Sequence, residues 1–166
     1  YNAQALAAAS DLLYVMDYDT RSQIFDRCLA SANIPAARIS RSIIRWTDLG
    51  ISPAKLIIGL PWYGYNYPCD EVEMESSSSK YCPLRFVPFR GVNCSDAAGG
   101  EEAFADVMEL LRSNATLEPG RRWDASTMTP YFNYKDDKAA VHQVWYDDAE
   151  SMAVKYRTAK EGGVRG

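Results

Sequence analysis

The stretch Leu12-Leu-Tyr-Val-Met-Asp-Tyr-Asp19 decides how the chain is interpreted. Its first five residues are apolar or aromatic, and such an unbroken run is typical of a strand buried on both faces of a parallel sheet. Asp17, Tyr18 and Asp19 follow at the carboxyl end of the predicted strand. In parallel α/β proteins these strand ends carry the chemistry, so we expect a polar site there.

A second stretch repeats this arrangement in Lys55-Leu-Ile-Ile-Gly-Leu-Pro-Trp-Tyr-Gly-Tyr-Asn-Tyr67, which predicts a second parallel strand. An amphipathic pattern over 36–49 predicts a helix between the two strands, as a right-handed crossover connection requires. The two strands would bring to one rim the side chains of Tyr18, Asp19, Trp62, Tyr63 and Tyr65. So many rings beside a carboxylate suggest a cleft of carbohydrate size.

The rest of the chain predicts short elements. Residues 1–10 are alanine-rich and helix-prone, and apolar residues at helical spacing predict helices at 23–32 and 101–113. A final helix is expected over 148–161, with Asp147 or Asp148 as its N-cap. Extended pieces are expected at 84–88, 130–134 and 140–145. Residues 68–83 contain four serines in a row and no periodicity, so we expect a surface loop there.

The composition excludes several classes of protein. Apolar residues make up 47% of the chain and charged residues 24%, which is typical of a globular protein. The net charge is −4 and no basic run occurs, which argues against a nucleic-acid partner. No apolar stretch reaches the roughly 18 residues of a membrane span. We therefore expect neither nucleic acid nor membrane as a partner, and the oligomeric state stays open.

Four cysteines, Cys28, Cys69, Cys82 and Cys94, accompany a single histidine, and no Cys-x-x-Cys occurs. We therefore expect no metal site, and no cofactor is indicated. Cys69 and Cys82 bracket the serine-rich loop and are the best disulfide candidates, worth roughly 3 kcal/mol if unstrained. Four free thiols are the alternative. Asn114-Ala-Thr116 is an N-glycosylation sequon, and with the cysteines it favours a secretory-pathway protein.

Several of these motifs resemble those of one enzyme family. Val15–Asp19 resembles the Met-x-Tyr-Asp motif on the sixth strand of glycoside hydrolase family 18 barrels, and Gly59–Gly64 resembles Gly-x-Pro-x-Tyr-Gly on the seventh. His142–Met152 resembles the run into the last barrel helix. Four further blocks resemble the chitobiase branch of the family, namely Pro61–Tyr65, Val87–Gly91, Cys94–Gly99 and Tyr131–Asp136.

This resemblance implies an α/β fold that is part of a (β/α)₈ barrel. Strands six and seven with their helices would occupy 1–67, a small α+β insertion 68–145, and the last barrel helix segment 146–166. The 166 residues are fewer than the roughly 250 of a complete barrel. The family's catalytic signature Asp-x-x-Asp-x-Asp-x-Glu, whose Glu is the general acid, does not occur in this sequence. We therefore expect the chain to be neither active nor stable alone.

The resemblance also implies the roles of individual residues. Enzymes of this family use the 2-acetamido oxygen of the substrate as the nucleophile in a retaining hydrolysis. By the motif match, Tyr18 and Asp19 would be the catalytic residues of this chain, because they hold the acetamido group and neighbouring hydroxyls. The implied substrate-binding residues are Met16, Tyr63, Tyr65 and Arg90. Core packing remains an alternative for Tyr63, and a solvated surface position remains one for Arg90. Trp62 is expected to be buried, because it points away from Tyr63 if the strand continues. Trp145 is expected to pack between the insertion and the barrel.

The implied activity of the full protein is hydrolysis of β-1,4-linked N-acetylglucosamine in chitooligosaccharides, in a lysosome or after secretion. Chitooligosaccharides are then the expected partners. Three alternatives stay open from the sequence: a family member that binds sugar without cleaving it, a peptidoglycan-cleaving relative, and an independently folded structural domain.

Overall fold

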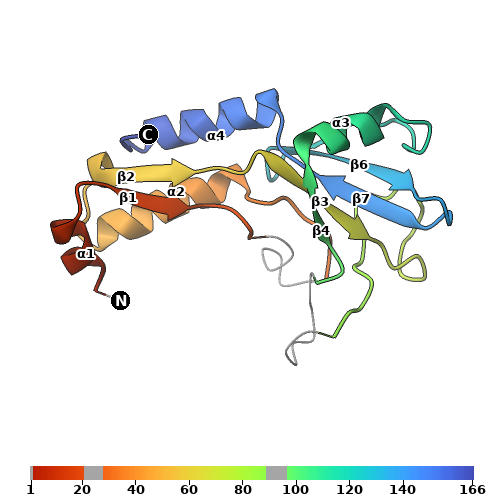
Figure 1. Cartoon of the computed structure of the whole chain (residues 1–166), viewed down its shortest axis with the longest axis horizontal. Helices are drawn as coiled ribbons and strands as arrows, with labels where there is room; N and C mark the ends of the chain where they lie inside the picture. Colours follow the sequence, from red (N-terminus) through yellow and green to blue (C-terminus); the bar gives the residue numbers. More distant parts are fainter. Residues whose placement is uncertain (1, 21–27, 89–96) are drawn as a thin grey trace.

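The computed structural model describes residues 2–20, 28–88 and 97–166 (Figure 1). Within these residues the chain forms a two-stranded parallel sheet and a five-stranded antiparallel sheet. The two sheets lie toward opposite ends of an elongated molecule, so the chain is a mixed α/β structure (Figure 1). No helix in the described ranges is both long enough and apolar enough to span a membrane.

The parallel sheet consists of β1 (Leu13–Met16) and β2 (Leu56–Gly59), with α2 (Ala36–Asp48) between them in sequence. The register aligns the first residues of both strands and the last residues of both, so their carboxyl ends meet at one edge, as predicted. A 3₁₀ turn, η2 (Pro53–Lys55), leads into β2. The C-terminal segment lies beside β2, because Arg165 N donates to Leu56 O.

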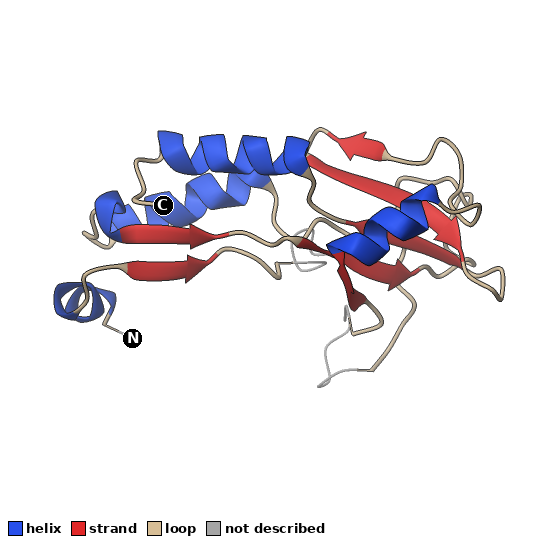
Figure 2. Cartoon of the chain, turned by 45° about the horizontal axis from the view of Figure 1, so that its top comes forward, coloured by secondary structure: helices blue, strands red, loops and turns tan. Residues whose placement is uncertain are grey.

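Helices cover one face of this parallel pair. α2 packs against α4 (Ala149–Glu161), and α1 (Ala3–Ala9) lies near the amino ends of the strands (Figure 2). Asp148 caps α4 through the Ser151 and Glu150 amides, which confirms one of the two predicted N-caps. The core between helices and strands includes Val15, Ile39, Ile43, Leu56 and Ile58. Each such side chain stabilises the fold by roughly 1.5–3 kcal/mol when fully buried.

The opposite face of β1 is open in the described structure. Tyr14 is 63% exposed and Met16 67% exposed, whereas Val15 between them is buried. Because neighbouring side chains of a strand point to opposite faces, the helices cover only one of the two rows. The expectation of a strand buried on both faces is therefore wrong for the chain as described.

The single strand expected over 55–67 is in fact two strands in two different sheets. β2 ends at Gly59, and β3 (Tyr63–Pro68) begins after Pro61. Proline has no backbone N–H to donate, and it is at Pro61 that the chain leaves the first sheet for the second. The aromatic part of the motif consequently belongs to the antiparallel sheet.

The antiparallel sheet has the strand order β4-β3-β7-β6-β5 among the described residues. Its remaining strands are β4 (Gly100–Ala103), β5 (Arg122–Asp124), β6 (Thr129–Lys135) and β7 (Val141–Trp145). α3 (Phe104–Arg112) covers one face of the sheet, where Val107 packs with Phe132 and Val144. The expected helix over 101–113 is thus shorter, because its first residues pair with β3 as a strand.

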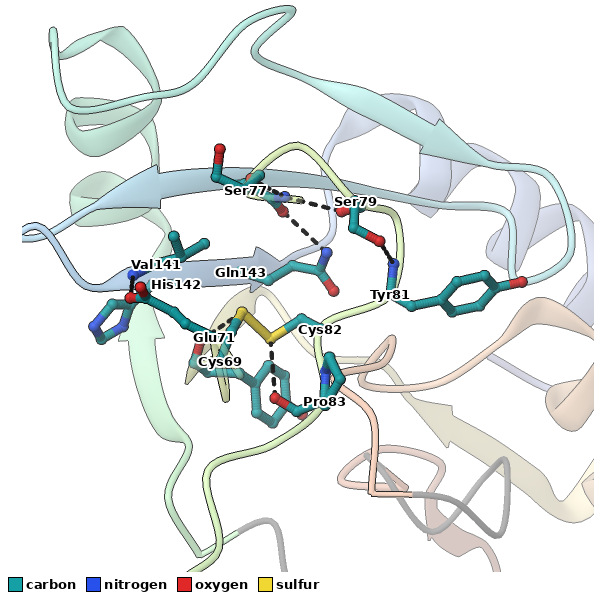
Figure 3. Close-up of a disulfide and its surroundings, with 12 residues drawn as sticks. Cys69, Glu71, Ser77, Ser79, Tyr81, Cys82, Pro83, Val141, His142 and Gln143 are labelled. Carbon is teal, nitrogen blue, oxygen red and sulfur yellow. Dashed lines mark hydrogen bonds between the residues drawn. A yellow bond between two sulfur atoms is a disulfide. The ribbon is translucent and has the colours of Figure 1, made fainter. Parts of the chain in front are cut away.

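The serine-rich loop covers the other face of this sheet and is closed by the predicted disulfide. Cys69 and Cys82 are bonded to each other, with 5.1 Å between their Cα atoms (Figure 3). Gln143 Nε2 donates to the Lys80 carbonyl, and Asn133 Nδ2 donates to two serine carbonyls of the loop. No cysteine of the described residues is free, so the alternative of free thiols is wrong there.

Two local predictions were wrong or only partly tested. The helix expected over 23–32 falls partly outside the described residues, and 28–32 are not helical. Leu29 forms a bridge with Pro83, and Ala30 N donates to Cys82 O, so partners distant in sequence replace the local bonds of a helix. The extended piece expected at 84–88 is limited to a bridge at Leu84.

Candidate active site

The candidate site lies where the loop after β1 meets β3 and β4 (Figure 1). Asp19, the last residue of the opening motif, has a backbone φ of +59°. This left-handed conformation is uncommon outside glycine, although aspartate and asparagine tolerate it better than most residues. The loop therefore needs contacts that hold it in this conformation.

Asn33 supplies those contacts. Its side chain is buried, and Asn33 Oδ1 accepts a hydrogen bond from Asp19 N at 2.5 Å. Its backbone carbonyl accepts from Thr20 N at 2.9 Å and from Thr20 Oγ1 at 2.7 Å. A single buried asparagine thus fixes the turn that presents the Asp19 carboxylate.

Two phenols of β3 hold that carboxylate. Tyr63 OH donates to Asp19 Oδ1 at 2.5 Å. Tyr65 OH lies 3.0 Å from the same oxygen and 3.1 Å from Glu101 Oε1 of β4. The two rings pack edge to face with their centroids 5.8 Å apart. We call Asp19, Tyr63, Tyr65 and Glu101 the carboxylate–phenol cluster.

The surroundings keep Tyr63 neutral. Burial raises the pKa of its phenol, and the hydrogen bond to Asp19 and the charges of Asp19 and Glu101 raise it further, while the nearby Asn33 amide opposes part of this rise. A phenol whose pKa is raised above 10 remains a hydrogen-bond donor at any physiological pH. The cluster therefore combines fixed donors with a carboxylate acceptor, which suits binding of neutral polar groups.

Asp17, the other aspartate of the motif, lies outside this cluster. Its side chain is buried, and burial raises the pKa of its carboxyl, opposed by a hydrogen bond with Ser42 of α2. Its Oδ2 finds no hydrogen-bond partner among the described residues. Asp17 therefore belongs to the packing between β1 and α2.

The predicted site residues meet different outcomes. The structure brings the carboxylate of Asp19 and the two β3 phenols into contact. Tyr18 is half-buried next to Asp19 in sequence, and Met16 lies on the open face of β1. Arg90 lies outside the described residues. The functional roles of all these residues stay predictions.

Trp62 and Trp145 were both expected to be buried. Trp62 is 50% exposed and packs on Phe104 with a centroid distance of 4.8 Å, so the expectation was wrong. It had assumed that one strand continues from 55 to 67. Trp145 is buried, stacks on Tyr131 at 4.7 Å and donates to Gln143 Oε1 at 2.7 Å, which confirms the second expectation.

A hollow of about 290 Å³ lies beside Trp145 on the face of the sheet that the disulfide loop covers. Lys80 and Asp124 line it and form an ion pair at 2.8 Å. Burial opposes ionisation of Asp124, but hydrogen bonds from Lys80, Thr127 and Ser126 outweigh it and lower the pKa of the carboxyl. The hollow is therefore bounded by a structural ion pair.

A second ion pair is fully buried at the start of α4. Lys155 Nζ donates to Asp147 Oδ1, which also accepts from Ser151 Oγ at 2.6 Å. Burial lowers the pKa of Lys155, and the charge of Asp147 opposes this shift. The described residues contain no cluster of three or more histidines, cysteines or carboxylates that could hold a metal ion. The ion pair therefore joins the segment between β7 and α4 to the helix itself.

Sequence reasoning missed two residues of the site. The sequence interpretation gave Asn33 no role in the site, and it placed Glu101 only at the start of a helix. No local pattern marks either residue, because each acts through a contact with a residue far along the chain. Asn114, the expected glycosylation position, lies in an exposed turn after α3, and its modification stays a prediction.

Comparisons with known proteins identify one family. Residues 1–166 match the model of the glycosyl hydrolases family 18. The chain is 40% identical to mouse (Mus musculus) di-N-acetylchitobiase and 39% identical to the human (Homo sapiens) protein of that name, each over 166 residues. These alignments cover the whole chain but 43% and 41% of those proteins, so the chain spans less than half the length of these relatives.

The fold is similar to part of a solved chitinase. A GH18 chitinase from Cycas revoluta, solved in complex with (GlcNAc)3, superposes with a TM-score of 0.73 at 24% identity. The superposition covers 100% of this chain and 43% of the chitinase. Both sheets are therefore parts of an arrangement found in that larger protein.

Proposed function

The chain belongs to glycosyl hydrolase family 18, and on this basis we propose that it is the C-terminal part of a chitobiase-like enzyme. The full protein would cleave β-1,4-linked N-acetylglucosamine in chitooligosaccharides. The identity of 39–40% to di-N-acetylchitobiases supports this substrate class. The observation that carries the proposal is the contact of Asp19 with Tyr63 and Tyr65 at the carboxyl end of β1.

The fold supports a place in a (β/α)₈ barrel. β1 and β2 would be its sixth and seventh strands, with α2 and α4 on the outside and the antiparallel sheet as an insertion. The open face of β1, with Tyr14 and Met16, would then face the barrel interior. The contact between Arg165 and β2 fits the start of the next strand.

The proposed chemistry is a substrate-assisted retaining hydrolysis. The 2-acetamido oxygen attacks the anomeric carbon, and a general acid protonates the leaving oxygen. Tyr18 would donate to the acetamido carbonyl, and Asp19 would accept from sugar hydroxyls. The general acid would be the glutamate of a signature motif in another part of the protein. For that reason we propose that the chain alone is inactive.

The β3 phenols would orient Asp19. Tyr63 donates to Oδ1 and the Tyr65 hydroxyl lies beside the same oxygen, so the carboxylate is fixed before a ligand arrives and little reorganisation accompanies binding. The raised pKa of Tyr63 keeps its proton in place across the pH range of an enzyme assay. Sugar rings also stack on aromatic faces, which gives Tyr63 a second way to contact a substrate.

We propose a lysosomal or secreted location. The Cys69–Cys82 disulfide and the exposed sequon at Asn114 support passage through an oxidising compartment. Analysis of the full-length protein with a deglycosylating enzyme tests this: loss of mass is expected, and an Asn114→Gln variant should lose one glycan. An unmodified protein with reduced cysteines would contradict the location.

The first test of function is hydrolysis of N-acetylglucosamine oligomers by the full-length protein, with product anomers followed by proton NMR. A β-anomer at first is the expected result of retention. Asp19→Asn should lower kcat/KM by about 10²-fold or more through lost orientation, with Asp137→Asn as a surface control. Binding of the oligomers without cleavage would indicate a sugar-binding protein. Cleavage of peptidoglycan in place of the oligomers would indicate a peptidoglycan-cleaving enzyme. Either result contradicts the proposal.

A further inference from the structure

The insertion reaches the candidate site through β4. In the register of β3 and β4, Glu101 lies directly opposite Tyr65, so the two side chains share one face of the sheet. Tyr65 OH and Glu101 Oε1 are 3.1 Å apart. The next residue, Glu102, points to the other face, where Asn66 Nδ2 is 3.4 Å from its carboxylate. Two neighbouring glutamates are thus separated by the sheet.

Tyr65 stands between two carboxylates with a single hydroxyl proton. Its oxygen is 3.0 Å from Asp19 Oδ1 and 3.1 Å from Glu101 Oε1, so the two distances favour neither acceptor. Asp19 Oδ1 already accepts the shorter bond from Tyr63. When Tyr65 donates to Glu101, Asp19 Oδ1 has one phenol donor, which is Tyr63. When Tyr65 donates to Asp19, the same oxygen has two.

We propose that Glu101 is a positioning residue which draws the Tyr65 proton away from Asp19 and so keeps Asp19 a strong acceptor for a sugar hydroxyl. Hydrogen bonds to a charged acceptor are stronger than those to a neutral one. The negative charge of Glu101 therefore allows it to compete with Asp19 for the hydrogen bond from Tyr65. The inference rests on the proposed function and extends it, because it makes a strand of the insertion part of the sugar-binding site.

Glu101→Gln tests this while keeping size and an acceptor oxygen. A neutral amide competes less well, so the Tyr65 proton passes to Asp19 and weakens its bond to the sugar. In the full-length protein we expect KM for N-acetylglucosamine oligomers to rise about tenfold with kcat nearly unchanged, because a contact made equally in ground and transition states is lost. Glu102→Gln, on the opposite face, is the matched control and should leave KM unchanged.

A double-mutant cycle separates positioning from a merely structural role. Glu101 acts through the Tyr65 hydroxyl, so Glu101→Gln should have no further effect on KM in a Tyr65→Phe background. Two results would overturn the inference while the proposed function stands. In the first, Glu101→Gln raises KM equally in the wild-type and Tyr65→Phe backgrounds. In the second, Glu101→Gln leaves KM unaltered, as Glu102→Gln does. A wild-type protein that neither binds nor cleaves the oligomers overturns the proposed function, and this inference with it.

Discussion

At the residue scale, the site depends on a backbone conformation that its own residue does not favour. Asp19 has a positive φ, and the turn is held by hydrogen bonds to the side chain and carbonyl of Asn33. An uncommon backbone conformation persists only where the surroundings determine it. Asn33 therefore decides where the Asp19 carboxylate points, although it lies 14 residues further along the chain.

Replacement of Asn33 should affect both stability and the site. In Asn33→Ala, Asp19 N loses its acceptor in a partly buried place, which costs about 1–3 kcal/mol. We expect a lower midpoint in urea unfolding of the full-length protein and a raised KM. Lys138→Ala, in the exposed turn between β6 and β7, is the control and should change neither quantity. An Asn33→Ala variant with an unaltered midpoint and KM would show that the turn holds without this contact.

The buried ion pair of Asp147 and Lys155 is a second feature at the residue scale. In Lys155→Ala the Asp147 carboxylate stays buried without its cation, which costs about 3–5 kcal/mol. We expect a clear fall of the thermal midpoint of the full-length protein. Lys160→Ala, exposed on the same helix, should stay within about 0.5 kcal/mol of the wild type. Equal midpoints for the two variants would contradict the importance of the pair.

At the scale of elements, the carboxylate of Asp124 links three segments, namely the disulfide loop, β5 and the turn after β5. Lys80 of the loop pairs with Asp124 at the end of β5, and Ser126 and Thr127 donate to the same carboxylate. These bonds lower the pKa of Asp124 below its ordinary 3.8. The stabilisation is therefore present above pH 3.8 and is lost as the pH falls through the lower value of the folded state.

Acid should weaken this part of the molecule in a way that depends on Asp124. Asp124→Asn removes the titrating group, so we expect stability between pH 5 and about 2 to fall less steeply than in the wild type. Chemical unfolding of the full-length protein at several pH values measures this slope. Asp137→Asn, on an exposed turn, should keep the wild-type slope. A slope for Asp124→Asn that equals the wild-type slope would contradict the assignment.

At the scale of the whole molecule, the described chain presents apolar surface that a stable protein covers. Tyr14, Met16 and Trp62 are each at least 50% exposed, and the first two lie on the open face of β1. The antiparallel sheet by contrast has both faces covered, by α3 and by the disulfide loop. The parallel part therefore depends more on surroundings than the antiparallel part does.

The isolated 166-residue chain should accordingly fold incompletely. We expect it to bind a hydrophobic dye such as ANS and to melt over a broad range, because none of the residues that the structure describes covers the apolar face or the outer edge of β1. The full-length protein is the control and should melt cooperatively without dye binding. A sharp, cooperative melt of the isolated chain would contradict this expectation and favour an independent domain.

The sequence by itself determined the elements whose cause is local. Apolar spacing predicted α2, and α4 was predicted with Asp148 as one of two candidate N-caps. The cysteines around the serine-rich loop predicted its disulfide. Periodicity, capping and short loop closure all act within a few residues, so they are visible along the chain. The Met-x-Tyr-Asp motif likewise pointed to Asp19 and to the family.

Only the tertiary structure decided which residues surround Asp19. It divided the second stretch at Pro61 and paired its aromatic end with β4, which brought Glu101 against Tyr65 over a separation of 36 residues. It also brought Asn33 under the turn and left Met16 on an open face. Sheet register and the covering of faces depend on contacts between distant segments, and no local pattern of residue types carries that information.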